Sequence, residues 1–259
     1  MALETFLISR FMVFTLVLGR TGALLMTAPI FGTTALPKHV RGLIAVAISL
    51  LVTPVFLETK MPPIGNLAEY GRIMANEVLV GLMLGLGINI MFSGVQVAGQ
   101  LVSQLSGMSL AEVASPGFDG DESVFSQLFY FLTLAVFVAV GGHRIVTQAL
   151  LDTFVALPPG HAALGDSFVQ VLTSILTQSF CLGARAAAPL LVSLLLSNIV
   201  LGLISRTLPQ INVIAVGFGI NALLALAVLF LSVGAAAWTF QEPTIDVLNR
   251  IQASFVGRS

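Results

Sequence analysis

The acidic residues that could bind a metal or move a proton lie most densely in one segment, Gly107–Glu122. This segment holds four acids, three glycines, one proline and no basic residue. Asp119 and Asp121 match the first positions of an EF-hand calcium loop. The sixth and twelfth positions, where glycine and glutamate are needed, are Val124 and Tyr130. The sequence therefore disfavours a calcium site.

No other group of reactive side chains predicts an enzyme. The apolar runs contain no paired carboxylates, and the chain contains neither a GxSxG nucleophile motif nor a P-loop. His143 and His161 stand alone in turn regions, and Cys181 is the chain's one cysteine, so no Cys/His zinc spacing exists. We therefore expect a protein that is not an enzyme and that needs neither a metal nor a cofactor.

The segment Gly107–Glu122 combines flexibility with apolar character. Its glycines and proline prevent a regular helix, so it should be deformable. A loop that is also partly apolar can fill a hole and leave it again, and the alternative is an ordinary loop outside the membrane. The residues that we interpret as a stopper are Gly107, Met108, Ser109, Leu110, Glu112, Pro116, Gly117, Phe118, Asp119 and Asp121.

Polar residues recur at spacings of three and four just before that segment and form one stripe on an otherwise apolar helix. The stripe consists of Asn89, Ser93, Gln96, Gln100, Ser103 and Gln104. Such a stripe either packs against other helices through hydrogen bonds or lines a watery passage, and we favour packing. Gly81 and Gly85 form a GxxxG spacing on the same helix, which favours the close approach of a second helix.

Charged residues within or beside the apolar runs are nearly all arginines. They are Arg20, Glu77, Arg144, Arg185 and Arg206. A proton relay usually needs Asp, Glu or His along its path, whereas arginine suits fixed ion pairs and snorkelling to the membrane surface. We therefore interpret these residues as contacts that hold an assembly together.

The elements that position these residues are membrane helices. Thr207–Gln241 runs for 35 residues without a Lys, Arg, Asp or Glu, and Val78–Ala111 does so for 34. About 20 apolar residues span a bilayer as a helix. The chain is 57% hydrophobic and 9% charged, with a mean hydropathy of +1.01 and a net charge of −1. This composition predicts a multi-pass membrane protein and excludes a nucleic-acid-binding protein.

Six apolar regions stand out. They are Phe6–Leu36, Gly42–Leu57, Ile73–Ser106, Val124–Gly141, Phe168–Ser205 and Ile211–Phe240. Gly42–Leu57 is short for a bilayer, whereas Phe168–Ser205 is too long for one straight crossing, so we expect a kink or a break at Pro189. With six spans, the distribution of Lys and Arg favours both termini in the cytoplasm. We also expect the first apolar helix to be retained rather than cleaved as a signal.

Eight short pieces of the chain follow, in order, the pattern of a known family. They are Arg20, Ala28–Phe31, Pro37–Arg41, Gly107–Ser109, Gly142–His143, Leu151–Phe154, Leu157–Gly160 and Gly202–Val213. Together they resemble the FliR-type flagellar biosynthetic proteins, and Gly202–Val213 is the most specific piece. The resemblance adds further residues to the predicted assembly contacts, which become Arg20, Glu77, Arg185, Arg206, Pro209, Gln210 and Asn212.

The resemblance implies a subunit of the type III protein export gate, which passes unfolded flagellar proteins across the bacterial inner membrane. It implies FliP- and FliQ-like partners in a helical staircase of hairpins, with FlhB- and FlhA-like proteins in the same apparatus. Energy would come from the proton-motive force and a separate soluble ATPase, so this subunit would not catalyse a reaction. The family's plug loop corresponds to Gly107–Glu122, with Met108 and Phe118 as plug contacts near a methionine-rich constriction from FliP.

We therefore expect an all-α fold, an integral membrane bundle of helical hairpins within an export-gate assembly. The expected division is into N-terminal helices (1–106), a plug loop (107–122), C-terminal hairpins (123–240) and a polar tail (241–259). One alternative is the homologous subunit of a virulence injectisome. Another is a secondary transporter for a small solute, although the break expected at Pro189 has no convincing counterpart in the first half. A purely structural bundle would leave the acidic loop unexplained.

Overall fold

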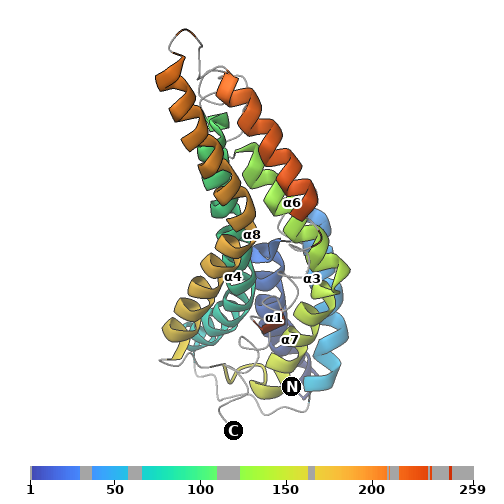
Figure 1. Cartoon of the computed structure of the whole chain (residues 1–259). Coiled ribbons are helices and arrows are strands. Elements are labelled where there is room, and N and C mark those ends of the chain that lie inside the picture. The colour runs from blue at the N-terminus through green and yellow to red at the C-terminus, as the bar shows by residue number, and fades with distance from the viewer. Residues whose placement is uncertain are drawn as a thin grey trace. The chain divides into compact units, whose positions relative to one another are not determined.

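The computed structural model describes residues 2–29, 37–57, 66–109, 123–162, 167–208, 210, 216–232, 234 and 245–246. Within these residues the chain forms helices and no strand, which confirms the predicted all-α class (Figure 1). The elements are α1 (Ala2–Thr27), α3 (Lys38–Val52), the 3-10 helix η1 (Thr53–Phe56), α4 (Leu67–Ser106), α6 (Val124–Ala139), α7 (Gly142–Ala156) and α8 (Ser167–Thr207). A further helix covers Val216–Ser232.

Four helices of the described residues are long and apolar enough to cross a membrane, and a fifth crossing results if α6 and α7 act as one bent span. The crossing segments are Leu7–Thr27, Lys38–Phe56, Leu67–Ser106 and Leu172–Thr207. The helix Val216–Ser232 is apolar but shorter. The described part of the chain therefore contains fewer spans than the six apolar regions suggested.

Two predictions about segment length are corrected by the structure. The apolar region Gly42–Leu57 overlaps a helical segment of 19 residues, Lys38–Phe56, which begins earlier because the helix starts directly after Pro37 and includes basic residues that a hydropathy count leaves out. Pro189 lies inside α8, which continues through it as one helix, so the break into two helices does not occur, whereas a kink at Pro189 stays a prediction. Proline is tolerated in membrane helices because neighbouring groups pair the backbone atoms that it frees.

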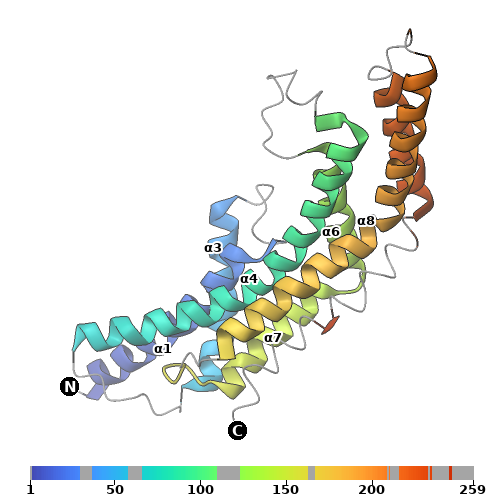
Figure 2. The ribbon, with the colours of Figure 1, turned by 60° about the vertical axis from the view of Figure 1, so that its left-hand side comes forward.

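The first compact unit consists of residues 1–90, 141–175 and 245–259. In it α1 lies alongside the first half of α4 (Figure 2). A Cβ atom added at Gly81 would lie 2.1 Å from the carbonyl oxygen of Arg20, and one added at Gly85 would lie 1.8 Å from Thr27 Oγ1. The GxxxG spacing therefore marks a close helix crossing, as its sequence predicted. The aromatic rings of Phe56 and Phe154, 5.9 Å apart, join η1 to α7.

The second compact unit consists of residues 91–140 and 176–244. Here α4 and α8 cross at Gly94 and Gly183, where a Cβ added to Gly183 would lie 2.2 Å from the carbonyl oxygen of Gly94. The start of α6 packs on α4 at Gly99, and Ser126 Oγ donates a hydrogen bond of 3.0 Å to the carbonyl oxygen of Gln96. Small residues at these crossings let the backbones approach as they do in membrane proteins generally.

Candidate functional site

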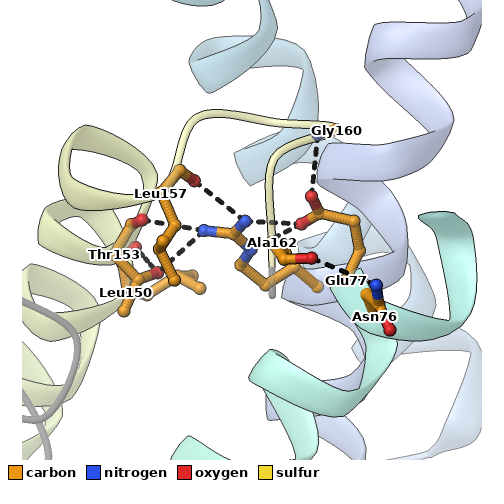
Figure 3. A network of polar contacts seen from close by, with 8 residues as sticks. Asn76, Glu77, Leu150, Thr153, Leu157, Gly160 and Ala162 are labelled. Carbon is orange, nitrogen blue, oxygen red and sulfur yellow. Dashed lines mark hydrogen bonds and ion pairs between the residues drawn. The ribbon is translucent and has the colours of Figure 1, made fainter. Parts of the chain in front are cut away.

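Among the described residues of the first unit, the guanidinium of Arg20, on α1, makes polar contacts with both α4 and α7 (Figure 3). Its side chain is fully buried, as is that of Glu77 on α4. Arg20 Nε donates to Glu77 Oε2 at 2.7 Å, and Nη2 lies 2.6 Å from the same oxygen. Two N–H groups of Arg20 thus converge on one carboxylate oxygen, and because both partners are charged, these are among the stronger hydrogen bonds.

The remaining N–H groups of Arg20 reach the C-terminal end of α7. Nη1 donates to the carbonyl oxygen of Thr153 at 2.9 Å and to its Oγ1 at 3.2 Å. Nη2 donates to the carbonyl oxygen of Leu157 at 3.0 Å. The last carbonyls of a helix have no intrahelical donor, and the C-terminal end of a helix attracts a cation. The guanidinium also lies over the ring of Phe154, 4.3 Å from its centroid.

Glu77 and its neighbour hold the turn that follows α7. Glu77 Oε1 accepts a hydrogen bond of 2.8 Å from the backbone N–H of Gly160, whose φ of +90° favours glycine. Asn76 Nδ2 donates to the carbonyl oxygen of Ala162 at 3.1 Å. Figure 3 shows Asn76 and Glu77 reaching the turn at Gly160 and Ala162 from α4, on the side away from Thr153. We call Arg20, Asn76, Glu77, Thr153 and the turn 157–162 the arginine clamp.

The arginine clamp joins three helices without any sign of reactive chemistry. Each of the five N–H groups of an arginine can make one such contact, and the structure gives Arg20 five contacts. No group of three or more His, Cys, Asp or Glu side chains that could hold a metal occurs among the described residues. A charge paired on every side holds a fixed geometry and is costly to disturb. The clamp is therefore a structural site.

The structure separates the charged residues that sequence analysis grouped as assembly contacts. Arg20 and Glu77 form a fixed ion pair, which is the kind of contact that the residue types predicted, and both side chains are buried within this chain. Their role as contacts to another subunit stays a prediction. Arg185, Arg206 and Gln210 are exposed, and for them assembly contact stays a prediction. Pro209 and Asn212 lie outside the described residues.

The polar stripe on α4 is left largely uncovered by the chain's own helices. Ser103 is buried and Gln96 is half-buried, whereas Asn89, Ser93, Gln100 and Gln104 are exposed. The exposure suits either of the two interpretations, a neighbouring helix of another subunit or a watery passage.

Only the first three residues of the predicted plug loop are described by the structure. Gly107 ends α4 with a φ of +82°, and its backbone N–H donates to the carbonyl oxygen of Gln104 at 3.2 Å. Met108 and Ser109 are half-buried. The remaining loop residues, 110–122, lie outside the described residues, so the plug role stays a prediction.

Several residues that make polar contacts in the structure were not among the predicted site residues. Asn76 and Thr153 belong to the arginine clamp, and Asn198 and Asn221 are hydrogen-bonded in the second unit. A polar side chain within an apolar helix needs a hydrogen-bond partner, so the sequence position of each of these residues already indicated a polar contact. The partner could not be deduced, because it lies tens of residues away in the sequence.

Comparisons with known proteins agree on one family. Residues 11–245 match the model of "Bacterial export proteins, family 1". A protein of Caulobacter vibrioides named flagellar biosynthetic protein FliR is 28% identical over 234 residues, which are 90% of this chain and 93% of the relative. The proteins of the same name from Escherichia coli (28% over 210 residues) and Bacillus subtilis (30% over 215 residues) each match at least 80% of both chains.

Proposed function

The chain belongs to the bacterial export proteins of family 1, of the FliR type, and from this premise we propose that it is a subunit of the flagellar protein export gate in the bacterial inner membrane. Its place in the flagellar export apparatus follows from the family. The gate would pass unfolded flagellar proteins, and this subunit would form part of the passage without catalysing a reaction.

The observation that carries the proposal is the extent of the family match. The match covers residues 11–245, so it includes most of both compact units and, apart from the first residues of α1, the helices named above. The relatives are aligned over most of their own length as well, so the likeness is not confined to one motif. These relatives are all named as flagellar proteins, which favours the flagellar apparatus over the homologous virulence injectisome.

We propose FliP- and FliQ-like subunits as direct partners, because this chain exposes an apolar face of α8 and polar side chains of α4 that partner helices would cover. The C-terminal half of α8 exposes six large apolar side chains, each between 53% and 63% exposed, namely Val192, Leu195, Leu196, Ile199, Val200 and Leu203. Lipid could cover these side chains, but not the exposed amides Gln100 and Gln104 of α4, which need polar partners or water. Helices of neighbouring subunits would cover the apolar side chains and pair with the amides, and a passage would supply the amides with water.

We further propose that residues 107–122 are the plug of this gate and that FlhB- and FlhA-like proteins join the same apparatus. The segment leaves α4 directly after the polar stripe, so a stopper and the exposed amides would belong to the same part of the passage. Its glycines, proline and apolar side chains suit a stopper that must yield to a passing chain.

The test is a purification of the tagged chain in mild detergent from the bacterium that makes it, followed by mass spectrometry. We expect FliP- and FliQ-like proteins at amounts comparable with the bait. A tagged multi-pass protein from another complex of the same membrane is the control for unspecific recovery. A stable, monodisperse monomer recovered without these partners would contradict the proposal, and partners of an injectisome would transfer it to that apparatus.

A further inference from the structure

Three polar side chains of the second unit form one directional chain of hydrogen bonds that ends on α4. Ser197 Oγ of α8 donates to Asn221 Oδ1 at 2.6 Å, and Asn221 lies on the helix Val216–Ser232. Asn221 Nδ2 donates to Asn198 Oδ1 at 2.7 Å. Asn198 Nδ2 in turn donates to the carbonyl oxygen of Leu105 at 3.0 Å. We call Ser197, Asn221 and Asn198 the asparagine relay.

The acceptor at the end of the asparagine relay is a backbone group at the end of a helix. α4 ends at Ser106, so the carbonyl of Leu105 is one of the last four, which have no intrahelical donor. The carbonyl of Gln104, one residue earlier, is taken by the N–H of Gly107 within the same turn. The carbonyl of Leu105 is instead held by α8. Asn198 therefore fixes the last turn of α4 relative to the hairpin formed by α8 and the helix Val216–Ser232.

This last turn is the point from which residues 107–122 leave. Gly107 adopts the left-handed conformation, with a φ of +82°. A Cβ atom added there would lie 3.9 Å from Phe218 Cδ2, so the same helix that carries Asn221 also lies close to the exit of the loop. Only one residue, Ser106, thus separates Leu105, the acceptor of the asparagine relay, from Gly107, where the loop begins.

Packing of α8 against the helix Val216–Ser232 alone does not explain why the relay ends on the backbone of α4. Apolar side chains of similar volume would join two membrane helices without unpaired polar atoms, and a half-satisfied polar network is worse than an apolar one. In the relay, the two donors and two acceptors that link the side chains are all used in one direction, and Asn221 is only 5% exposed. The direction leads to the terminus of α4.

We propose that Asn198, supported by Asn221 and Ser197, is a positioning residue that holds the last turn of α4 and with it the start of residues 107–122. This inference rests on the proposed function for its meaning, because it takes residues 107–122 as the plug. Its structural content, that the relay fixes the start of that loop, can be tested independently of the plug.

The test measures how accessible the start of the loop is in the full apparatus. In a Cys181→Ser background, Ser109→Cys places the chain's one thiol at a half-buried position of the loop. Its rate of reaction with a membrane-impermeant maleimide is followed in cells that contain all gate subunits. Asn198→Leu removes the bond to Leu105, and we expect the rate to rise roughly five-fold, the effect of losing one hydrogen bond.

Two serine variants of α8 separate the relay from a general loss of structure. Ser197→Ala removes only the donor to Asn221 and should raise the rate by a smaller amount, about two-fold. Ser205→Ala removes a hydroxyl that donates to the carbonyl of Gly202 on an exposed face of the same helix, and should leave the rate unchanged.

An unchanged rate in Asn198→Leu, in complexes recovered at normal yield, would overturn the proposal. If that variant does not assemble, Ser197→Ala decides, and a rate equal to that of Ser205→Ala overturns it as well. The plug is tested separately, by the ion conductance of a loop deletion. A deletion without leakage together with raised labelling in Asn198→Leu would reject the plug and keep the relay.

Discussion

Arg20 of α1 and Glu77 of α4 are 57 residues apart in the sequence, yet Arg20 Nη2 lies 2.6 Å from Glu77 Oε2 and neither side chain is exposed. The same guanidinium binds two carbonyl oxygens at the end of α7, and the same carboxylate binds the N–H of Gly160. One ion pair therefore fixes the mutual positions of three helices in the first unit. The consequences for stability can be stated and measured.

Arg20→Met should destabilise the chain strongly, because it leaves the carboxylate of Glu77 buried without its cation. Breaking a buried pair in this way costs about 3–5 kcal/mol of the free energy of unfolding. The amount of protease-resistant chain in isolated membranes measures the effect. The stability of Arg20→Lys should lie between that of the parent chain and that of Arg20→Met. Lysine keeps the positive charge, but its ammonium has three N–H donors at one point and cannot make five separate contacts.

The double variant Arg20→Met with Glu77→Met is the control for this interpretation. Since it removes both charges, it should be less destabilised than Arg20→Met alone, although the N–H of Gly160 and the carbonyl of Leu157 lose their partners. If Arg20→Met is as resistant to protease as the parent chain and only lowers recovery of the gate, the arginine is an assembly contact after all.

Gly81→Ala should separate α1 from α4. A Cβ at this position would lie 2.1 Å from the carbonyl oxygen of Arg20, which is backbone and cannot turn away. We expect a loss of about 1–3 kcal/mol in the free energy of unfolding, the usual range for overpacking. The rate of proteolysis of the chain in membranes measures it.

Gly71→Ala on the same helix is the matched control, because an added Cβ there has no heavy atom within 4 Å. Alanine is favoured over glycine in a helix by up to about 1 kcal/mol, so this variant should be neutral or slightly stabilised. Equal proteolysis of the two variants would show that the close crossing at Gly81 does not limit stability.

The arginine clamp shows which parts of this structure could be predicted from the sequence. The residue type was informative: arginine suits a fixed ion pair, and Arg20 forms one. The GxxxG spacing also predicted a close helix crossing, because it depends only on the local geometry of one helix. The identity of the partner and the burial of the pair depend on which helices meet, and this depends on contacts between segments 57 or 133 residues apart.

Two predictions about the helices differ from the structure for local reasons: α7 was not predicted, and a break was expected at Pro189. α7 was not recognised as an element of its own because its sequence contains His143, Arg144, Gln148 and Asp152, so it does not stand out as an apolar run. The break expected at Pro189 does not occur because the rest of α8 supplies enough helical hydrogen bonds to continue past one missing donor. Ser193 Oγ adds a hydrogen bond of 2.7 Å to the carbonyl oxygen of Pro189 itself.

Arg206→Ala should weaken assembly of the gate more than it weakens insertion of the chain. Arg206 lies in the last turn of α8 and is exposed, so its loss leaves the fold of this chain intact. If a carboxylate or a carbonyl of a neighbouring subunit binds it, recovery of the complex should fall several-fold, because the partner group is then left unpaired. Quantitative purification of the complex, normalised to the amount of chain in the membrane, measures this.

Arg72→Ala is a suitable comparison for Arg206→Ala, since Arg72 is also exposed but lies near the start of α4, in the other unit. It should leave recovery unchanged. A normal yield of complex with Arg206→Ala would remove this residue from the set of assembly contacts.

Removing the proposed plug should make the assembled gate leak ions. The two ends of the loop cannot simply be joined, because α6 packs on α4 at Gly99, seven residues before α4 ends, which is about 10 Å along the helix axis. The deletion of residues 107–122 therefore needs a short Gly-Ser bridge, so that α4 and α6 keep their contacts. Membrane conductance of cells with the bridged deletion should rise clearly above that of the parent strain.

A second variant shows which property of the loop closes the passage. Replacing Met108, Leu110, Val113 and Phe118 by serine keeps the length, the glycines and the acids but removes the large apolar side chains. If these side chains fill the hole, this variant should leak nearly as much as the deletion, whereas replacing the acids by their amides should not leak. Unchanged conductance in the bridged deletion, in gates recovered at normal yield, would show that the passage is closed by another part of the assembly, and the segment would then be an ordinary loop.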